Sequence, residues 1–287
     1  MIQDYECKPE DADQGMLEVI KLNSLPVPDI YLEKEQMIRF AMLERETGGK
    51  PFCTIPPDHT LEAEALGGKV RYGNEVAGPR AEVPVCQSLD ELMEYSGLDT
   101  SKGRIREALD ACRDLRKNGQ EVLFQMSGPL TIWNTLIDVK HVLKGMRKSP
   151  EQLEVLLKNV EEDMLRLLVE VKKSGVRLVS YADSAGGLQI LGPKSMEWMT
   201  RIFTISFLRR AEEIMGQEMT MILCPKTGMA LIGTELAVHG EILVPGVMTY
   251  QEACVQAVGK ASFISQVCIN RRNTVIKNGK LMTIELI

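Results

Sequence analysis

Three residues with the chemistry of metal ligands follow apolar, strand-like runs in the second half of the chain. Asp183 follows VRLVSYA, and Cys268 follows ASFISQV. Cys224 ends the run MTMIL and is followed at once by a proline and a turn. In parallel α/β proteins, the residues after the strands converge on one edge of the sheet. Two thiolates and a carboxylate with an open fourth position suit a catalytic zinc ion. We therefore predict a zinc site made of Asp183, Cys224 and Cys268.

Other polar side chains at expected strand ends are candidates for holding a substrate. His59 and Ser127 follow the first two strand-like runs, Tyr181 lies in SYADSAGG, and Lys226 follows the proline after MTMILC. His239, in AVHGEI, is an alternative metal ligand. The spacing of these residues has little specificity, because the chain contains no CxxC or HExxH segment. The other five cysteines read as apolar packing residues: Cys7, Cys53, Cys86, Cys112 and Cys254.

The elements that must position these residues alternate along the chain. Short β-branched runs such as EVLFQMS and VRLVSYA are separated by helical patterns of ten to about 25 residues, which is typical of an α/β protein with a parallel sheet. Six or seven strands are evident, and we favour a (β/α)8 TIM barrel over a doubly wound sheet. Residues 1–287 are expected to form one domain, with 1–49 as an N-terminal helical extension and a hairpin at 69–85.

Composition excludes several classes of protein. The formal net charge is −6 without a long basic run, which disfavours nucleic-acid binding. The N-terminus lacks the pattern of a signal peptide, and no stretch is long and apolar enough for a transmembrane helix. Seven scattered cysteines do not suggest a disulfide framework. We expect a cytoplasmic protein with reduced thiols and no bound nucleic acid or membrane. A homodimer stays open.

Four segments resemble the uroporphyrinogen decarboxylase-like superfamily: FQMSGPLTI, SYADSAGG, MILCPKTGMAL and VMTYQEACVQAVGKASFISQVCI. The resemblance covers roughly residues 30–270 and implies a (β/α)8 barrel. The superfamily contains porphyrinogen decarboxylases, which carry an arginine-rich first strand that binds substrate carboxylates. The first strand here reads KPFCTIPPDHT and has no arginine, which argues against decarboxylation of a polycarboxylate.

The resemblance is greater to the cobamide-dependent methyltransferases, which carry zinc at the barrel mouth. Members that methylate thiols use an HxC motif and a distant cysteine. Cys224 and Cys268 match the two cysteines, but Ile222 occupies the histidine position. The chain is also similar to methyltransferase I components of corrinoid O-demethylases, which use a carboxylate with two cysteines. The resemblance implies a corrinoid (cobalamin) carried by a partner protein.

Three hypotheses about function follow. The first is a zinc-dependent methyltransferase that moves a methyl group from a small methoxylated aromatic substrate, a phenyl methyl ether, to the cob(I)alamin of a corrinoid protein. The second is a methylcobamide:thiol methyltransferase, which the expected charge of the site favours, because two thiolates and a carboxylate leave Zn²⁺ a weak Lewis acid. The third is a uroporphyrinogen decarboxylase-like protein or a non-catalytic barrel that binds a partner.

Overall fold

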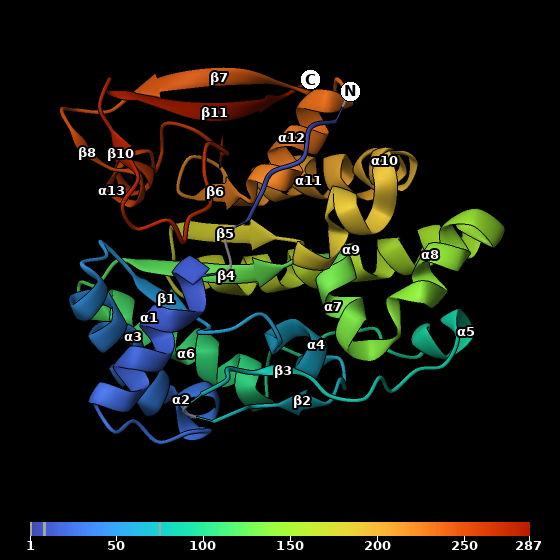
Figure 1. The fold of residues 1–287 in the computed structure, drawn as a ribbon, viewed down its shortest axis with the longest axis horizontal. Helices are drawn as coiled ribbons and strands as arrows, with labels where there is room; N and C mark the ends of the chain where they lie inside the picture. The colour runs from blue at the N-terminus through green and yellow to red at the C-terminus, as the bar shows by residue number, and fades with distance from the viewer. Residues whose placement is uncertain (1, 8–9, 75) are drawn as a thin grey trace.

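The computed structural model describes residues 2–7, 10–74 and 76–287 of the chain, and Figure 1 shows their arrangement. The strands are β1 (Cys53–Ile55), β2 (Val70–Arg71), β3 (Arg80–Ala81), β4 (Val122–Ser127), β5 (Leu178–Ala182), β6 (Thr220–Leu223), β7 (Ala237–Leu243), β8 (Met248–Thr249), β9 (Phe263–Ile264), β10 (Val275–Ile276) and β11 (Lys280–Leu286). The α-helices are α1 (Glu10–Leu22), α2 (Asp29–Leu32), α3 (Lys34–Gly48), α4 (Leu61–Ala65), α5 (Leu89–Leu92), α6 (Gly103–Lys117), α7 (Pro129–Leu136), α8 (Val139–Lys148), α9 (Pro150–Lys173), α10 (Leu188–Met199), α11 (Ile205–Met215), α12 (Pro225–Gly233) and α13 (Tyr250–Gln256). A 3₁₀ turn covers Ser184–Gly186, and a π-helical turn covers Thr200–Thr204.

The central sheet has seven strands in the order β1-β4-β5-β6-β9-β11-β7. The first five strands in this order are parallel, as the alternation of strands and helices predicts. The last two differ from an all-parallel barrel, because β11 is antiparallel to both β9 and β7. The charged C-terminal stretch therefore contributes a strand that we did not predict. Long helices cover one face of the parallel strands (Figure 1).

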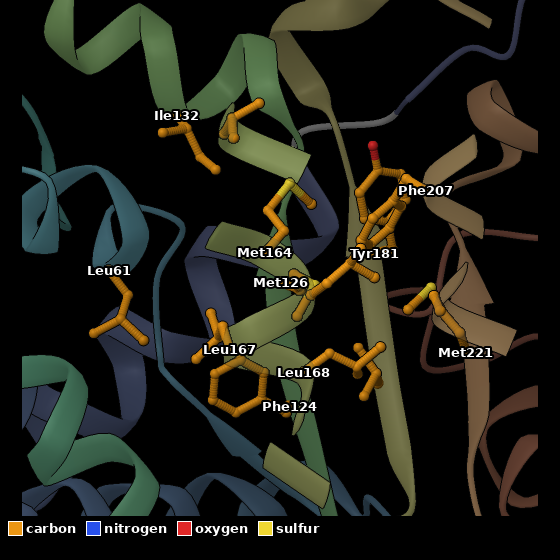
Figure 2. Close-up of a cluster of buried hydrophobic side chains, with 14 of the residues drawn as sticks. Leu61, Phe124, Met126, Ile132, Met164, Leu167, Leu168, Tyr181, Phe207 and Met221 are labelled. Atoms are coloured by element: carbon orange, nitrogen blue, oxygen red, sulfur yellow. The ribbon is translucent and has the colours of Figure 1, made fainter. Parts of the chain in front are cut away.

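The outer face of the sheet is the one that packs against α9 and α11. Phe124, Met126 and Tyr181 on the strands join one buried cluster with residues of these helices. Figure 2 shows Tyr181 beside Phe207 of α11, with ring centroids 5.3 Å apart. These side chains occupy alternate positions on β4 and β5, since successive residues of a strand point to opposite faces. The residues between them on each strand therefore point to the inner face of the sheet.

The inner face of the sheet carries the intervening residues. Leu123, Leu178 and Ile222 form a second buried cluster with Tyr250 and Cys254 of α13. These apolar residues close the end of the inner face where the parallel strands begin. The two thiols that we predicted to be packing residues of helices, Cys112 and Cys254, are fully buried in the core.

Several predicted elements are confirmed. The hairpin at 69–85 is the β2–β3 pair, and the long helix that begins at Pro150 is α9. Ser88 caps α5 by accepting a hydrogen bond from the backbone N–H of Glu91. The segment PKSMEWMTRIFTISFLRRAEEIMG (193–216), whose pattern reads as one helix, is interrupted by the π-helical turn between α10 and α11. In the part of the chain that the structure describes, every helix is too short or too polar to span a lipid bilayer.

Candidate active site

Side-chain alternation decides which predicted residues share a face. Gln125, Ser180 and Ile222 are paired in register across β4, β5 and β6, so they lie in one row on the inner face. Cys224 follows Ile222 by two residues, which places it on the inner side of the strand end. Asp183 follows the outer-facing Tyr181 by two residues. Extended past the strand ends, alternation would put Cys224 and Asp183 on opposite sides, but besides burial both raise the pKa of the Tyr181 hydroxyl, and so both lie near it.

Cys224 follows the carboxyl end of β6, and Cys268 is near enough to affect its pKa. Burial raises the pKa of the Cys224 thiol to about 11, and negative charge on Cys268 and Cys7 contributes to the increase. A neutral thiol must lose its proton before it can bind a metal. Cys268 is not at a strand end as predicted, because β9 ends at Ile264 and the thiol lies in the loop that follows. Cys7 is exposed, so it is not a packing residue.

Residues 2–7 lie against this loop. The backbone N–H of Cys268 donates a hydrogen bond of 3.3 Å to the hydroxyl of Tyr5. The guanidinium of Arg271 lies 5.1 Å from the centre of the Tyr5 ring and donates to the backbone oxygen of Glu6 at 3.3 Å. The N-terminal segment thus packs over the loop that carries Cys268.

Asp183 binds the N-terminus of α7. Its Oδ1 accepts hydrogen bonds from the backbone N–H (2.7 Å) and hydroxyl (2.8 Å) of Thr131, and its Oδ2 accepts one of 3.2 Å from the N–H of Leu130. Burial raises the pKa of the carboxyl, and the bonds from Thr131 and Leu130 oppose that increase. An aspartate before a glycine-rich loop often caps the turn that follows it, but Asp183 makes no side-chain cap bond to the turn at Ser184–Gly186. It instead caps a helix that follows the neighbouring strand.

Gly128, Tyr181 and Asp183 are tightly packed together. A Cβ atom on Gly128 would lie 2.4 Å from the Cβ of Asp183 and 2.8 Å from the hydroxyl oxygen of Tyr181. Glycine is therefore required for this approach. Lys226 reaches the same region, because a Cβ on Gly187 would lie 3.0 Å from its Nζ. Tyr181, Asp183 and Lys226 line a small cavity of about 30 Å³, which is room for about one water molecule.

Ser127 and His59 lie near the start of α4. The Ser127 hydroxyl donates to the backbone oxygen of His59 at 3.2 Å, and its N–H donates to Oε1 of Glu62 at 2.8 Å. Glu62 is fully buried, and its Oε2 has no hydrogen-bond partner among the described residues. Burial raises the pKa of this carboxyl to about 7. Ser127 is fully buried, and its hydroxyl is used in the bond to the backbone of His59.

His239 is on β7, opposite Ile284 of β11. It lines a cavity of about 480 Å³ together with Pro225, Ser265 and Gln266. This cavity is separate from the one that His59 lines. His239 therefore stays an alternative ligand that the structure places on the antiparallel edge of the sheet.

The three predicted zinc ligands do not form one group in this structure. Among the described residues, no three His, Cys, Asp or Glu side chains form a group that could hold a metal ion. Cys224 and Cys268 are of the residue type that a thiophilic metal prefers. Both Asp183 oxygens accept hydrogen bonds from the start of α7, so this carboxylate does not complete the set in the present arrangement.

A cavity of about 510 Å³ opens on the inner face, beside the loop that carries Cys268. Thr54 of β1 and Gln125 of β4 line it, as do His59 and, from the Cys268 loop, Arg272. Its volume is in the usual range for small-molecule sites. Of the predicted substrate-binding residues, His59 lines this cavity; Tyr181 and Lys226 line the smaller one. Sequence reasoning missed Thr54, Gln125 and Arg272; the polar Gln125 within a buried strand was the available signal.

The sequence matches the profile of the family described as "Uroporphyrinogen decarboxylase (URO-D)" over residues 19–237. The chain belongs to the URO-D family. The matched region includes Asp183 and Cys224 and ends before Cys268. The (β/α)8-type fold predicted from the sequence is that of this family, here with the last two sheet strands antiparallel.

Two curated proteins similar to this URO-D family chain are named "Methylcobamide:CoM methyltransferase MtaA". The protein from Methanosarcina barkeri (strain Fusaro / DSM 804) is 24% identical over 187 residues, which cover 64% of this chain and 55% of that protein. A second from Methanosarcina barkeri is 23% identical over 221 residues, covering 76% of this chain and 64% of that protein. The match thus spans less than two thirds of the length of these relatives.

A solved structure has the same fold. It is a methyltransferase from Methanosarcina mazei, with a TM-score of 0.64 and 20% sequence identity. The match covers 82% of this chain and 68% of the other. At this identity the likeness concerns the fold, and it agrees with the barrel-type architecture expected for the URO-D family.

Proposed function

We propose that this protein is a cobamide-dependent methyltransferase that takes a methyl group from a small methoxylated aromatic compound. The observation that carries the proposal is that Cys224, after β6, and Cys268 are near enough for Cys268 to affect the pKa of Cys224, in a URO-D family chain. The methyltransferase names of its relatives support it. The acceptor is the cob(I)alamin of a separate corrinoid protein, and the site of action is the cytoplasm.

The reaction breaks the bond between the methyl carbon and the ether oxygen. Cob(I)alamin supplies the electron pair that forms the new cobalt–carbon bond, and the bonding pair leaves with the oxygen as a phenolate. When bound to Cys224 and Cys268, zinc supplies the Lewis acidity that eases this departure. The chain's own part is to hold the ether in the cavity with its methyl group directed at the corrinoid.

Asp183 enters the proposal as the third metal ligand. The carboxylate has lone pairs beyond those used by Leu130 and Thr131, and Oδ2 makes the longer bond, of 3.2 Å. Rotation of the side chain about its own bonds would be required to bring this oxygen to the inner side. His239 stays the alternative donor.

A second candidate is transfer from a methylcobamide to a thiol, which the names of the two Methanosarcina relatives favour. Against it, Ile222 occupies the position of the histidine in the thiol-methylating members, and it is buried in the inner apolar cluster. The site therefore lacks a second donor from β6. This difference is why we place ether demethylation first.

Two assays, one for each candidate reaction, separate the two functions. The zinc-loaded protein is mixed with cob(I)alamin and a set of methoxyarenes, and the spectrum of methylcob(III)alamin is followed. In parallel it is mixed with methylcobalamin and thiols, and the appearance of cob(I)alamin is followed. Methylcobalamin formation from an ether is the expected result. Demethylation of methylcobalamin by thiols alone would establish the second candidate, and no transfer in either direction would contradict both.

Metal content tests the site without turnover. Cys224→Ala and Cys268→Ala should each reduce bound zinc from about one ion per chain to a small fraction, because two of the donors are thiolates. Mass spectrometry of the metal in purified protein measures this. The buried cysteines of α6 and α13 provide matched controls: Cys112→Ala and Cys254→Ala should retain zinc. Full zinc retention in both site variants would eliminate the thiol pair as ligands.

A further inference from the structure

The central sheet ends on a long strand that has a neighbour on one side only. β7 is last in the sheet order, pairs with β11 over all seven of its residues, and forms the upper border of the sheet in Figure 1. Edge strands in natural proteins are usually short, bulged or interrupted by proline, which prevents pairing with another strand. β7 has none of these features. All but its first residue also lie beyond the URO-D match, which ends at 237.

The register shows which backbone groups of β7 point away from β11. The N–H of Val244 donates to the oxygen of Gly279 at 2.9 Å. The N–H of Ile287 donates to the oxygen of Leu236 at 3.0 Å. Because hydrogen-bonded pairs alternate along antiparallel strands, the even-numbered residues of β7 bond to β11 and the odd-numbered residues direct their N–H and C=O groups outward. Within the described chain, no turn, loop or side-chain group bonds to these outward groups.

The side chains along this edge are complementary to a second copy of the same strand. When two β7 strands pair antiparallel about Gly240, His239 of each copy lies opposite Glu241 of the other, so the same polar contact forms twice. On the opposite face Val238, which is 47% exposed, lies against Ile242 of the other copy. Centring the pair on His239 or on Glu241 would instead place two identical side chains opposite each other.

Glycine suits the position on the axis. The two Gly240 residues form a non-hydrogen-bonded pair, in which the Cα atoms of antiparallel strands are about 4.5 Å apart. A Cβ on Gly240 would already overlap Oε1 of Glu285 and Oγ1 of Thr283 within one chain. The absence of a side chain therefore lets a second strand approach closely.

Charged groups near the axis act in both directions. Glu241 is exposed and is held by Lys280 of its own chain at 2.8 Å. A carboxylate has about four lone-pair sites, so Glu241 can also accept a hydrogen bond from His239 of the other copy. Glu285 is exposed and leans over Gly240, so its carboxylate opposes pairing with a copy that carries the same charge.

We propose that two copies of this chain associate through β7, with the strands antiparallel and Gly240 on the two-fold axis. The two seven-stranded sheets then join into one continuous sheet. A second copy is the occupant because the same strand supplies both members of each cross-strand pair. The inference concerns assembly and is independent of the reaction proposed above.

Exchanging the two polar residues tests this arrangement. The mass of the purified protein is measured by analytical ultracentrifugation over a range of concentrations, and a monomer–dimer equilibrium is expected. His239→Glu should weaken the dimer at least about 10-fold, because it places two carboxylates opposite each other twice. Adding Glu241→His to that variant swaps the pair and should return the affinity to within about threefold of the wild type. His141→Glu, on α8, is the matched control and should leave the dimer unchanged.

Amide hydrogen exchange measured by NMR gives a second test on the unmodified protein. The outward N–H groups of His239 and Glu241 should exchange more slowly as the protein concentration rises, because the dimer bonds them. The N–H groups of Gly240 and Ile242 bond within the hairpin and should be protected at every concentration. Glu285→Gln should strengthen the dimer, because it removes the like charges near the axis.

Several results would overturn the proposal. One is a protein that stays monomeric up to about 1 mM. Another is a dimer that His239→Glu leaves intact, or that the swapped variant does not restore, because its interface then lies elsewhere. Exchange at His239 that is independent of concentration, or a dimer that Glu285→Gln does not strengthen, would contradict pairing about Gly240.

Discussion

At the scale of single residues, Glu62 carries an ionisable group into the interior beside the active-site strand ends. Its pKa is raised to about 7 by burial, and the bond from the Ser127 N–H only partly opposes the shift. In the unfolded chain the pKa of a glutamate is about 4.3. Between these values the folded state binds more protons than the unfolded state. Stability is therefore fully present at low pH and falls as pH rises toward 7.

Replacing Glu62 by glutamine should flatten this dependence. Glutamine keeps an oxygen to accept the Ser127 N–H and cannot ionise. The free energy of unfolding is measured with urea at several pH values. Its decline from acidic to neutral pH should be smaller in the variant than in the wild type by about 3 kcal/mol. Glu154→Gln, on an exposed face of α9, should leave the decline unchanged. If Glu62→Gln shows the same decline in stability with pH as the wild type, Glu62 is not the group responsible.

Asp183 is a second residue whose partners make a prediction. Asparagine has one carbonyl oxygen, so Asp183→Asn can keep the bonds from Thr131 but would direct its amide toward the N–H of Leu130. We expect a loss of about 1–3 kcal/mol in urea unfolding. If Asp183 also binds zinc, metal affinity should fall about 10-fold or more.

Thr131→Val distinguishes these two roles of Asp183. It removes the hydroxyl bond to Oδ1 and leaves the carboxylate charge intact. Stability should fall while zinc affinity remains. An Asp183→Asn protein with unchanged stability would contradict the helix-capping role, and one with unchanged zinc affinity would remove Asp183 from the metal site.

Sequence reasoning located the ends of β5 and β6 correctly but not the direction of the side chains that follow them, and it placed Cys268 at the end of a strand that stops at Ile264. Cys224 was predicted to face the mouth, and this stays a prediction because β6 ends at Leu223, one residue before it. Asp183 follows an equally clear strand, but its parity is that of Tyr181 on the outer face. The direction of Asp183 was readable from VRLVSYA, in which the apolar Val179 and Tyr181 alternate with Ser180. The site of Arg272 was not, because it depends on contacts with residues more than 200 positions earlier in the chain.

At the scale of elements, the start of α7 depends on close packing between two strand ends. Gly128 has φ −82°, which alanine can adopt, so any effect of Gly128→Ala is steric. The added Cβ would lie 2.4 Å from the Cβ of Asp183. We expect a loss of about 1–3 kcal/mol in stability, measured by urea unfolding. Unchanged stability would mean that α7 can shift away without losing its cap.

The elements themselves were largely predictable, because helix and strand periods are local properties. The β2–β3 hairpin and helices α6 and α9 lie where the pattern indicates. Two elements were not. The strand predicted over ASFISQVCI shortens to Phe263–Ile264, and β11 arises from a charged segment whose pairing with β7 and β9 is a tertiary effect.

At the scale of the whole molecule, the N-terminal segment and the loop after β9 meet across nearly the full length of the chain. Tyr5 and Cys268 are 263 residues apart in sequence. Tyr5→Phe removes the hydroxyl that accepts the Cys268 N–H and keeps the ring under Arg271. We expect the Cys268 amide to exchange its hydrogen about two- to tenfold faster.

Hydrogen exchange followed by mass spectrometry or NMR measures this effect. The Cys224 amide, which donates to the backbone oxygen of Tyr181 at 2.8 Å, is the internal control and should be unchanged. Faster exchange at both amides would indicate general loosening and contradict a local contact.

This separation also has a consequence in time. A ribosome adds about 5–20 residues per second, so roughly 15–50 s pass between the synthesis of Tyr5 and that of Cys268. During that interval Cys7, and later Cys224, are present in the nascent chain before the loop that carries Cys268 has been made. The thiols can meet only after almost the entire polypeptide has been made. The metal site of Cys224 and Cys268 that we propose can therefore form only at the end of biosynthesis, once the loop after β9 has been made.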